Sequence, residues 1–253
     1  MQEKKKNYYI KANRIFNPIR KYGWIGTIVI AIGGLWEPKL GLAVVLVMAG
    51  LTITSFFNGR YWCGNICFHG SLFDKIILPI SKNKKIPAFF KSKPIIIGFF
   101  IFFMANFTRK IIVLSQFWGT YDILDKLGLL FSNTYLMVLI VGGALAMFIN
   151  PRTWCQFCPM GTIQKLSHLL GRKLGITKNT EKKITIFDKN KCISCGKCAK
   201  VCPFQLTPYK EFSDNNQLDN LNCIKCSTCV VNCPVKILSL EKGIELETVE
   251  DAA

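Results

Sequence analysis

The chain has 253 residues, of which 50% are apolar and 19% are charged, and its mean hydropathy is positive at +0.28. An ordinary soluble domain is roughly 25% charged, so this composition argues against a disordered chain and against a plain soluble enzyme. The net charge of +18 belongs entirely to residues 1–179, because residues 180–253 carry equal numbers of basic and acidic side chains. No nucleic-acid-binding motif accompanies the charge, so we set DNA and RNA aside and predict a membrane protein.

Four apolar stretches lie within the first 179 residues. The second and fourth approach the ~20 residues that a helix needs to cross a bilayer, and the first and third are shorter. We predict four transmembrane helices, arranged as two hairpins. The stretches are 23–36, 40–57, 94–107 and 129–149.

Charge placement predicts the orientation of these helices. Residues 1–21 and 60–93 each hold seven Lys or Arg, whereas the turn at 37–39 and the loop at 108–128 are weakly charged. Basic loops stay in the cytoplasm. The sequence therefore predicts a multi-pass protein of the cytoplasmic (inner) membrane with both termini in the cytoplasm. The four stretches contain no Asp, Glu, Lys, Arg or His, which argues against an ion pump or carrier.

A short motif occurs twice, each time after the second helix of a hairpin. Both copies read Arg-x-Trp-Cys, then two or three residues, then Cys-x-x-Gly followed by Ser or Thr. The repetition predicts that the hairpins are related by duplication and that both motifs lie at the cytoplasmic edge of the membrane. The residues that we single out are Arg60, Cys63, Cys67, His69, Arg152, Cys155 and Cys158.

The last part of the chain carries the spacing Cys-x2-Cys-x2-Cys-x3-Cys-Pro twice. This spacing is typical of bacterial ferredoxins with two [4Fe–4S] clusters, in which the fourth cysteine of each run binds the other cluster. Zinc sites use four ligands and fit eight cysteines in this register poorly. The assigned ligands are Cys192, Cys195, Cys198 and Cys233 for cluster 1, and Cys223, Cys226, Cys229 and Cys202 for cluster 2.

Apolar alternation on either side of the cysteine runs predicts short strands. The predicted fold is therefore a membrane α-helical domain over 1–179, with about four transmembrane helices in two duplicated hairpins, followed by an α+β domain over 180–253. The second domain is expected to resemble a bacterial 2[4Fe–4S] ferredoxin.

The cysteines of the repeated motif, Cys63, Cys67, Cys155 and Cys158, are called here the membrane-edge cysteines. Three interpretations are open. They bind a third iron–sulfur cluster, they form redox-active thiol pairs, or they are buried structural thiols that pack as small apolar groups. A structural disulfide is disfavoured on a reducing cytoplasmic face.

The neighbours of these cysteines are equally ambiguous. Arg60 and Arg152 either offset the negative charge of thiolates or of a cluster, or anchor the chain at the lipid head groups. His69 is a candidate for contact with a metal or a quinone head group, and the alternative is a solvated side chain. No second suitably placed histidine accompanies it, which disfavours a bis-His haem.

The combination of two Trp-Cys motifs with a doubled ferredoxin run resembles the NapH/NosR/MauN-type membrane-bound 4Fe–4S ferredoxin family over about residues 20–240. Phe68 stands where members carry proline, and the second motif has Cys-x2-Cys-Pro in place of the x3 form. The resemblance implies electron transfer between a quinone pool, or a membrane partner, and a redox enzyme. The alternative is a redox maturation or repair factor that reduces a metal centre or a thiol of a client. With no catalytic acid, base or nucleophile evident, we expect an electron-transfer subunit of an oxidoreductase complex.

Overall fold

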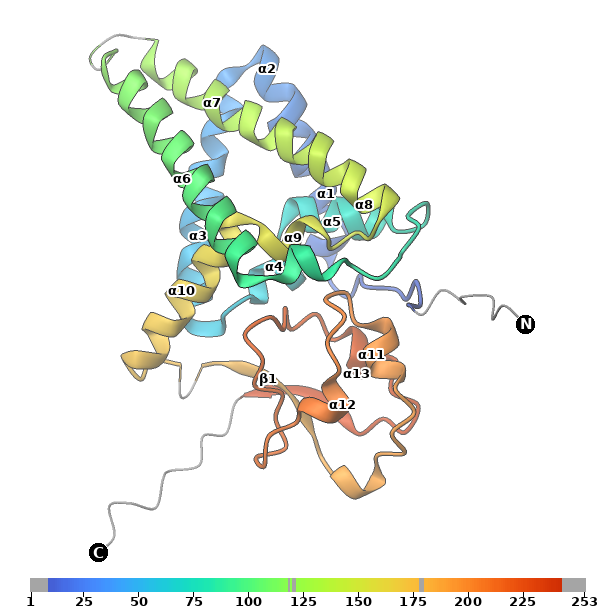
Figure 1. The fold of residues 1–253 in the computed structure, drawn as a ribbon. Coiled ribbons are helices and arrows are strands. Elements are labelled where there is room, and N and C mark those ends of the chain that lie inside the picture. Colours follow the sequence, from blue (N-terminus) through green and yellow to red (C-terminus); the bar gives the residue numbers. More distant parts are fainter. Residues whose placement is uncertain (1–8, 118, 120–121, 178–179, 243–253) are drawn as a thin grey trace, which may run out of the picture.

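The computed structural model describes residues 9–117, 119, 122–177 and 180–242. A helical part lies above a smaller, loop-rich part in the view of Figure 1. The helical part contains, in chain order, α1 (Pro18–Ile28), η1 (Val29–Gly33), α2 (Gly34–Trp36), η2 (Pro38–Leu42), α3 (Ala43–Asn58), α4 (Tyr61–Asn65), α5 (Phe68–Leu72), η3 (Phe73–Ile77), η4 (Ala88–Lys91), α6 (Lys93–Ser115), α7 (Ile123–Met137), η5 (Val138–Gly142), α8 (Gly143–Phe148), α9 (Trp154–Phe157) and α10 (Pro159–Lys173).

Among the described residues, three helices are long and apolar enough to cross a membrane: Pro38–Asn58, Lys93–Ser115 and Ile123–Phe148. They correspond to the second, third and fourth predicted spans. The first predicted span lies in the helical run of α1, η1 and α2, where Arg20 and Lys21 occupy the first turn and lower the hydropathy. The sequence prediction is thus supported for three of its four spans.

The third span is longer than its sequence predicted. We expected it to end at residue 107, yet α6 continues to Ser115. Arg109 and Lys110 interrupt the apolar run, but charged side chains do not break a helix as Gly or Pro would. The helix therefore carries the two charges in its last turns and reaches the length that a span requires.

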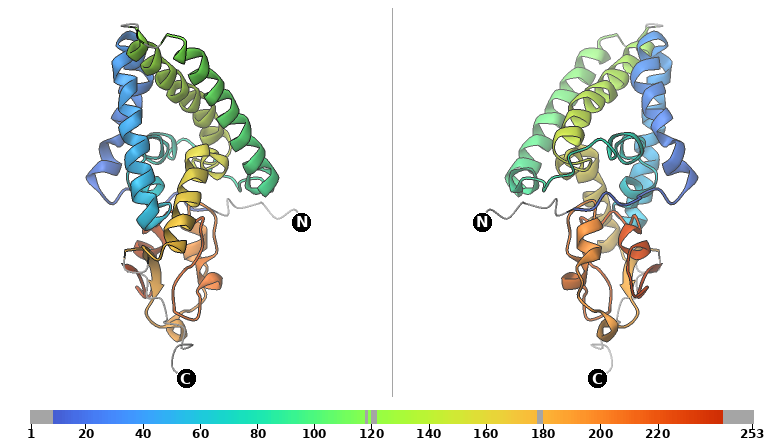
Figure 2. Two further views of the ribbon diagram at one scale, coloured as in Figure 1. Left: turned by 90° about the vertical axis from the view of Figure 1, so that its left-hand side faces the viewer. Right: turned by 90° about the vertical axis from the view of Figure 1, so that its right-hand side faces the viewer.

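The two hairpins meet where η2 crosses α7. A Cβ on Gly41 would lie 1.9 Å from the carbonyl oxygen of Gly128, and a Cβ on Gly128 would lie 1.9 Å from that of Pro38. Glycine allows helices in a membrane to approach this closely. The long helices diverge from this crossing like the arms of an inverted V (Figure 2).

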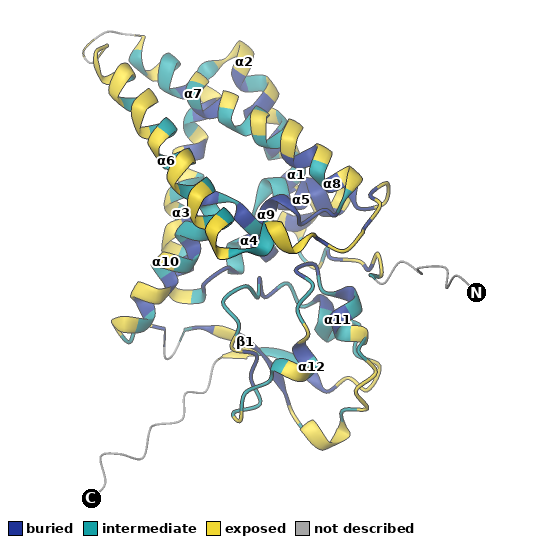
Figure 3. Cartoon of the chain, viewed as in Figure 1, coloured by how far each residue is buried: buried dark blue, intermediate teal, exposed yellow. Residues whose placement is uncertain are grey.

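Burial follows the same layout (Figure 3). The outer faces of the long helices are exposed, whereas buried residues gather around the short helices between their lower ends. Leu72, Phe73 and Trp154 belong to one buried apolar group there. The short helices α4, α5 and α9 and the longer α10, which follow the second helix of each hairpin, therefore lie together at one edge of the predicted membrane region.

The lower part is built on an antiparallel pair of strands, β1 (Lys182–Ile186) and β2 (Leu238–Lys242), with Ile184 opposite Leu240. The predicted boundary at 179–180 adjoins residues 178–179, which lie outside the described residues. The remaining elements are η6 (Lys189–Lys191), α11 (Lys197–Val201), α12 (Pro208–Glu211) and α13 (Thr228–Val231).

Candidate iron–sulfur sites

The structure gathers the eight ferredoxin-type cysteines into two separate pockets. Both pockets combine three cysteines of one run with the last cysteine of the other run, as the spacing predicts. One pocket is lined by Cys192, Cys195, Cys198 and Cys233, and the other by Cys202, Cys223, Cys226 and Cys229. These are the two sets assigned above to cluster 1 and cluster 2, and the pockets are called here site 1 and site 2.

Each cysteine loop has the backbone shape of an anion-binding nest. Ser194 and Gly196 in one loop, and Lys225 and Ser227 in the other, have φ values of 50°, 68°, 53° and 58°. Left-handed residues that alternate with ordinary ones turn successive backbone N–H groups towards one concave side, as in many Fe–S sites. The loops therefore fit a cluster whose sulfur atoms accept hydrogen bonds.

The thiols of site 2 are withdrawn from water. Burial raises the pKa of Cys202 to about 12 and that of Cys223 to about 11, and it raises the pKa of Cys229 well above its usual value. These three metal-free thiols therefore hold their protons at neutral pH, and binding of iron must displace those protons. Among the described residues no three His, Cys, Asp or Glu side chains converge on a single metal ion.

The four membrane-edge cysteines line one cavity of about 190 Å³. Cys63 lies on α4 and Cys155 on α9, whereas Cys67 and Cys158 occupy the N-caps of α5 and α10. The backbone N–H of Gly70 lies 3.4 Å from the Sγ of Cys67. The second cysteine of each motif thus occupies the N-cap position of a helix, and at α5 its Sγ accepts the backbone N–H of Gly70.

The arginine of each motif donates a hydrogen bond to the main chain of the other motif. Arg60 donates to the carbonyl oxygen of Cys155 at 2.8 Å, and Arg152 donates to that of Cys63 at 3.3 Å. Each guanidinium also lies near the Sγ of its own motif, at 3.9 Å for Cys63 and 3.7 Å for Cys155. Arg60 and Arg152 are only 2% and 0% exposed, so they do not reach the lipid head groups as anchors would.

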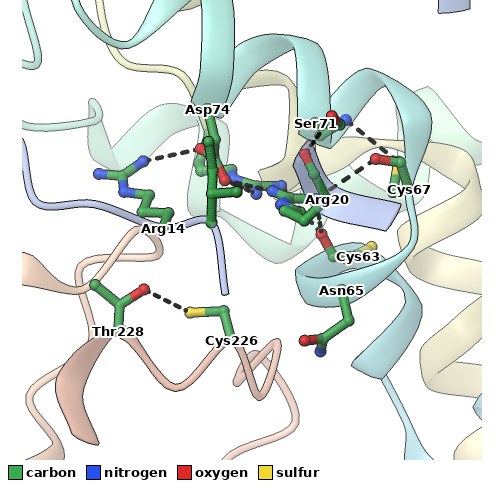
Figure 4. A network of polar contacts seen from close by, with 12 residues as sticks. Arg14, Arg20, Cys63, Asn65, Cys67, Ser71, Asp74, Cys226 and Thr228 are labelled. Atoms are coloured by element: carbon green, nitrogen blue, oxygen red, sulfur yellow. Dashed lines mark hydrogen bonds and ion pairs between the residues drawn. The ribbon is translucent and has the colours of Figure 1, made fainter. Parts of the chain in front are cut away.

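Arg20 and Asp74, which we did not single out from the sequence, complete this site. The Asp74 carboxylate forms ion pairs with Arg20 and Arg152, and with Arg14 at 3.2 Å. Figure 4 shows Arg20 between Asp74 and the main chain of the first cysteine motif. One signal could have revealed Asp74, because it is the single acidic residue in the basic segment 60–93.

The site carries an excess of buried positive charge. Arg14, Arg20, Arg60 and Arg152 are all buried, and Asp74 is the carboxylate that the described residues place among them. Buried charges are costly unless they are paired, so this excess calls for an anionic group. Four thiolates that hold an iron–sulfur cluster supply one.

Several buried donors in this site have no acceptor among the described residues. They include Nε and Nη1 of Arg60 and Nε of Arg152. Gln164, which was also missed in the sequence, donates to the Sγ of Cys63 at 3.0 Å. Hydrogen bonds to sulfur are a regular feature of iron–sulfur sites. Donors, thiols and charge thus all fit a third cluster.

His69 lines the cavity that the membrane-edge cysteines share. Its Nε2 lies 3.3 Å from the carbonyl oxygen of Tyr135, and the two rings are 4.5 Å apart. Withdrawal from water lowers the pKa of His69 to about 4, although its hydrogen bond to Tyr135 opposes this shift. The imidazole is therefore neutral at physiological pH.

Site 2 adjoins the membrane-edge cysteines. Cys63 and Cys155 form one buried apolar group with Phe204 and Ile224, and Cys202 and Cys226 of site 2 pack against that group. Asn65 also donates to the carbonyl oxygen of Lys225 at 3.2 Å. The guanidinium of Arg60 lies 4.5 Å from the ring centre of Phe204. The two cysteine sites are thus in direct packing contact across this junction.

Comparison with known families supports the iron–sulfur interpretation. Residues 40–87 and 132–177 match a family described as a 4Fe-4S binding domain, and residues 184–242 match one described as a 4Fe-4S dicluster domain. Each of the first two segments contains one pair of membrane-edge cysteines, and the third contains both ferredoxin runs. The chain therefore carries ferredoxin-type iron–sulfur domains in both of its parts.

The chain is also similar to a protein of Methanocaldococcus jannaschii named "Uncharacterized protein MJ0749". The two are 25% identical over 172 residues, which is 65% of this chain and 60% of the relative. The chain thus spans about 60% of the length of this curated relative. No solved structure matches the chain.

The junction between site 2 and the membrane-edge cysteines depends on Gly64. A Cβ at this position would lie 2.0 Å from the carbonyl oxygen of Ile224, so Gly64→Ala must push the two parts apart. Overpacking of this kind costs about 1–3 kcal/mol. We expect a lower melting temperature, measured through the visible absorbance of the clusters. The control is Gly98→Ala, whose Cβ meets no described atom within 4 Å and which should leave melting unchanged or raise it. Equal melting of both variants would contradict a close junction.

Proposed function

We infer that the chain is a membrane-anchored electron-transfer protein of the NapH/NosR/MauN type, which relays electrons between a quinone pool or other membrane partner and a redox enzyme. The observation that carries this proposal is the unbroken series of cysteine sites. The membrane-edge cysteines follow the predicted spans, site 2 packs against them, and site 1 shares the strand-built core of the same domain. Iron–sulfur clusters bound at these sites supply one-electron transfer.

The cavity beside the membrane-edge cysteines favours a lipid-soluble partner. The cavity that contains the membrane-edge cysteines continues along α3 from Leu51 to Val44, which is about 10 Å of helix. Phe103 and Phe107 of α6 form part of its wall, and none of the described residues of α6 is buried. A mostly apolar cavity with few polar groups is typical of a small-molecule site. Here its position favours a quinone.

His69 and Tyr135 provide the polar contacts that such a ligand needs. Both line the cavity beside the membrane-edge cysteines. The Tyr135 phenol can donate a hydrogen bond to a quinone carbonyl, whereas the neutral His69 ring uses its Nε2–H on the Tyr135 carbonyl oxygen and leaves Nδ1 to accept a hydrogen bond from a quinol hydroxyl. These residues would hold the head group next to the first cysteine site, while the apolar walls exclude water.

Quinone oxidation of reduced protein tests this proposal. Protein in lipid nanodiscs is reduced with dithionite, freed of excess reductant, and mixed with decylubiquinone or menadione in a stopped-flow spectrometer. We expect rapid reoxidation of the clusters in the wild type. In Leu51→Trp, which fills the cavity, a steric cost of about 1–3 kcal/mol should slow the reaction by ~10–100-fold.

A matched variant separates cavity filling from a general effect of tryptophan. Ile53 lies on the same helix and is 60% exposed, so Ile53→Trp should react like the wild type. Iron content is measured in both variants. If fully loaded wild-type protein reacts with neither quinone, the relay to quinone is wrong, and the alternative of a maturation or repair factor is favoured.

A further inference from the structure

The surface around site 1 is exposed, whereas the surface around site 2 is covered by the helical part. Site 2 faces the helical part, but Cys195 of site 1 is exposed, and apolar side chains beside it are exposed as well. Ile193 is 64% exposed and Phe187 is 60% exposed. Together with Val231 and Val235 they leave apolar surface next to a redox site uncovered within the described structure.

Exposed lysines surround this apolar surface. Lys189 and Lys191 lie on η6, Lys197 begins α11, and Lys236 follows the last cysteine run. Asp188 lies beside these lysines, and its ion pair with Lys191 spans 3.7 Å at the surface. We name this surface the basic collar. It consists of Phe187, Lys189, Lys191, Ile193, Lys197, Val231, Val235 and Lys236.

The positive charge of the basic collar is local. Residues 180–253 carry no net charge as a whole, so the lysines here are balanced by acidic residues elsewhere. Asp219 pairs with Arg172 of α10 and Glu181 with Lys225, and both contacts lie on the side that faces the helical part. The exposed edge of site 1 is thus more positive than the domain that carries it.

We propose that the basic collar is the docking surface for a one-electron redox protein whose own cofactor edge is acidic. Apolar side chains within a charged rim are the usual anatomy of a transient interface, and opposite charges steer the encounter. Figure 1 places η6 at the end of the lower part that points away from the long helices, so a soluble protein can reach it. This proposal rests on the proposed function, because it names the partner at the cytoplasmic end of the series.

Two acceptor proteins of opposite charge test the docking surface. Dithionite-reduced protein in nanodiscs is mixed with an acidic blue-copper protein or with a basic c-type cytochrome. In each case one electron leaves an iron–sulfur cluster and reduces Cu(II) to Cu(I) or Fe(III) to Fe(II). We expect the rate with the acidic protein to fall about tenfold or more as salt is raised, since electrostatic steering is screened.

Reversing the charge of three lysines tests whether the salt dependence of the rate arises at the basic collar. Lys191→Glu/Lys197→Glu/Lys236→Glu should slow the acidic acceptor about tenfold at low salt and speed the basic one. The control Lys21→Glu/Lys39→Glu/Lys173→Glu makes the same charge change at exposed lysines of the helical part and should alter neither rate as much.

Three results would overturn the proposal. The first is a wild-type rate with the acidic acceptor that does not depend on salt, which needs no variant to measure. The second is an equal effect of the two triple variants at unchanged iron content. The third is a tenfold faster rate after deletion of 243–253, which holds four acidic residues, because the chain's own tail would then occupy the collar. Since dithionite supplies the electrons, these results do not depend on quinone, and failure of the quinone reaction leaves them interpretable.

Discussion

Anaerobically purified wild-type protein is expected to contain about twelve irons and as many acid-labile sulfides per chain, and Cys155→Ala about eight. The reason is that Cys155 and the other membrane-edge cysteines line one cavity amid an excess of buried arginine, which fits a third [4Fe–4S] cluster. Removal of one ligand should release that cluster and leave sites 1 and 2 loaded. Iron and sulfide analysis, with EPR of the reduced protein, measures the difference.

Thr153→Ala is the matched control for this experiment. Thr153 is the buried variable residue of the second motif, between Arg152 and Trp154, and its hydroxyl has no hydrogen-bond partner among the described residues. This variant should keep all twelve irons. About eight irons in both the wild type and Cys155→Ala would exclude a third cluster and leave the membrane-edge cysteines as redox thiols or packing residues.

Asp74→Asn is expected to be strongly destabilising. The substitution keeps the shape of the side chain but removes the carboxylate that pairs with Arg14, Arg20 and Arg152. Loss of one partner from a buried ion pair costs about 3–5 kcal/mol, because the other charge is left uncompensated. At this chain length the melting temperature should fall by at least ~6 °C.

Asp214→Asn provides the comparison, because Asp214 is exposed and the change in formal charge is the same. It should shift the melting temperature by no more than a degree or two, as surface substitutions do. Measurement on cluster-loaded and on chelator-stripped protein adds a second test. The Asp74→Asn defect should be larger in stripped protein, where no cluster offsets the arginines. Equal melting of the two variants would show that Asp74 does not balance this site.

The sequence predicted the parts of this protein that follow from local pattern. The hydropathy of 40–57 and 129–149 marks two spans, and the cysteine spacing predicts which ligands come together in sites 1 and 2. It set the end of α6 too early, because a pair of charges lowers hydropathy without breaking a helix. The predicted span 23–36 is not among the three helices that are long and apolar enough to cross a membrane, because Arg20 and Lys21 in the first turn of α1 lower the hydropathy of that helical run.

The contents of the membrane-edge site could not be predicted in the same way. Asp74, Arg20 and Gln164 reach it from three separate helical segments, so no spacing along the chain connects them. Arg60 and Arg152 were recognised as motif residues, but their positions are also what lipid anchoring would produce. Only the packing of the two motifs against each other distinguishes the buried role from the anchoring one.

The exchange of Arg60 and Arg152 has a consequence for the ancestry of the chain. Arg60 of the first motif binds the main chain of the second motif, and Arg152 of the second motif binds the main chain of the first. The same contact therefore occurs twice, with the two halves interchanged. Two identical subunits related by a two-fold axis make contacts of this kind. A homodimer of single hairpins could therefore have assembled the whole site before the halves became one polypeptide. The two halves differ at equivalent motif positions, where the first carries Phe68 and the second carries Pro159.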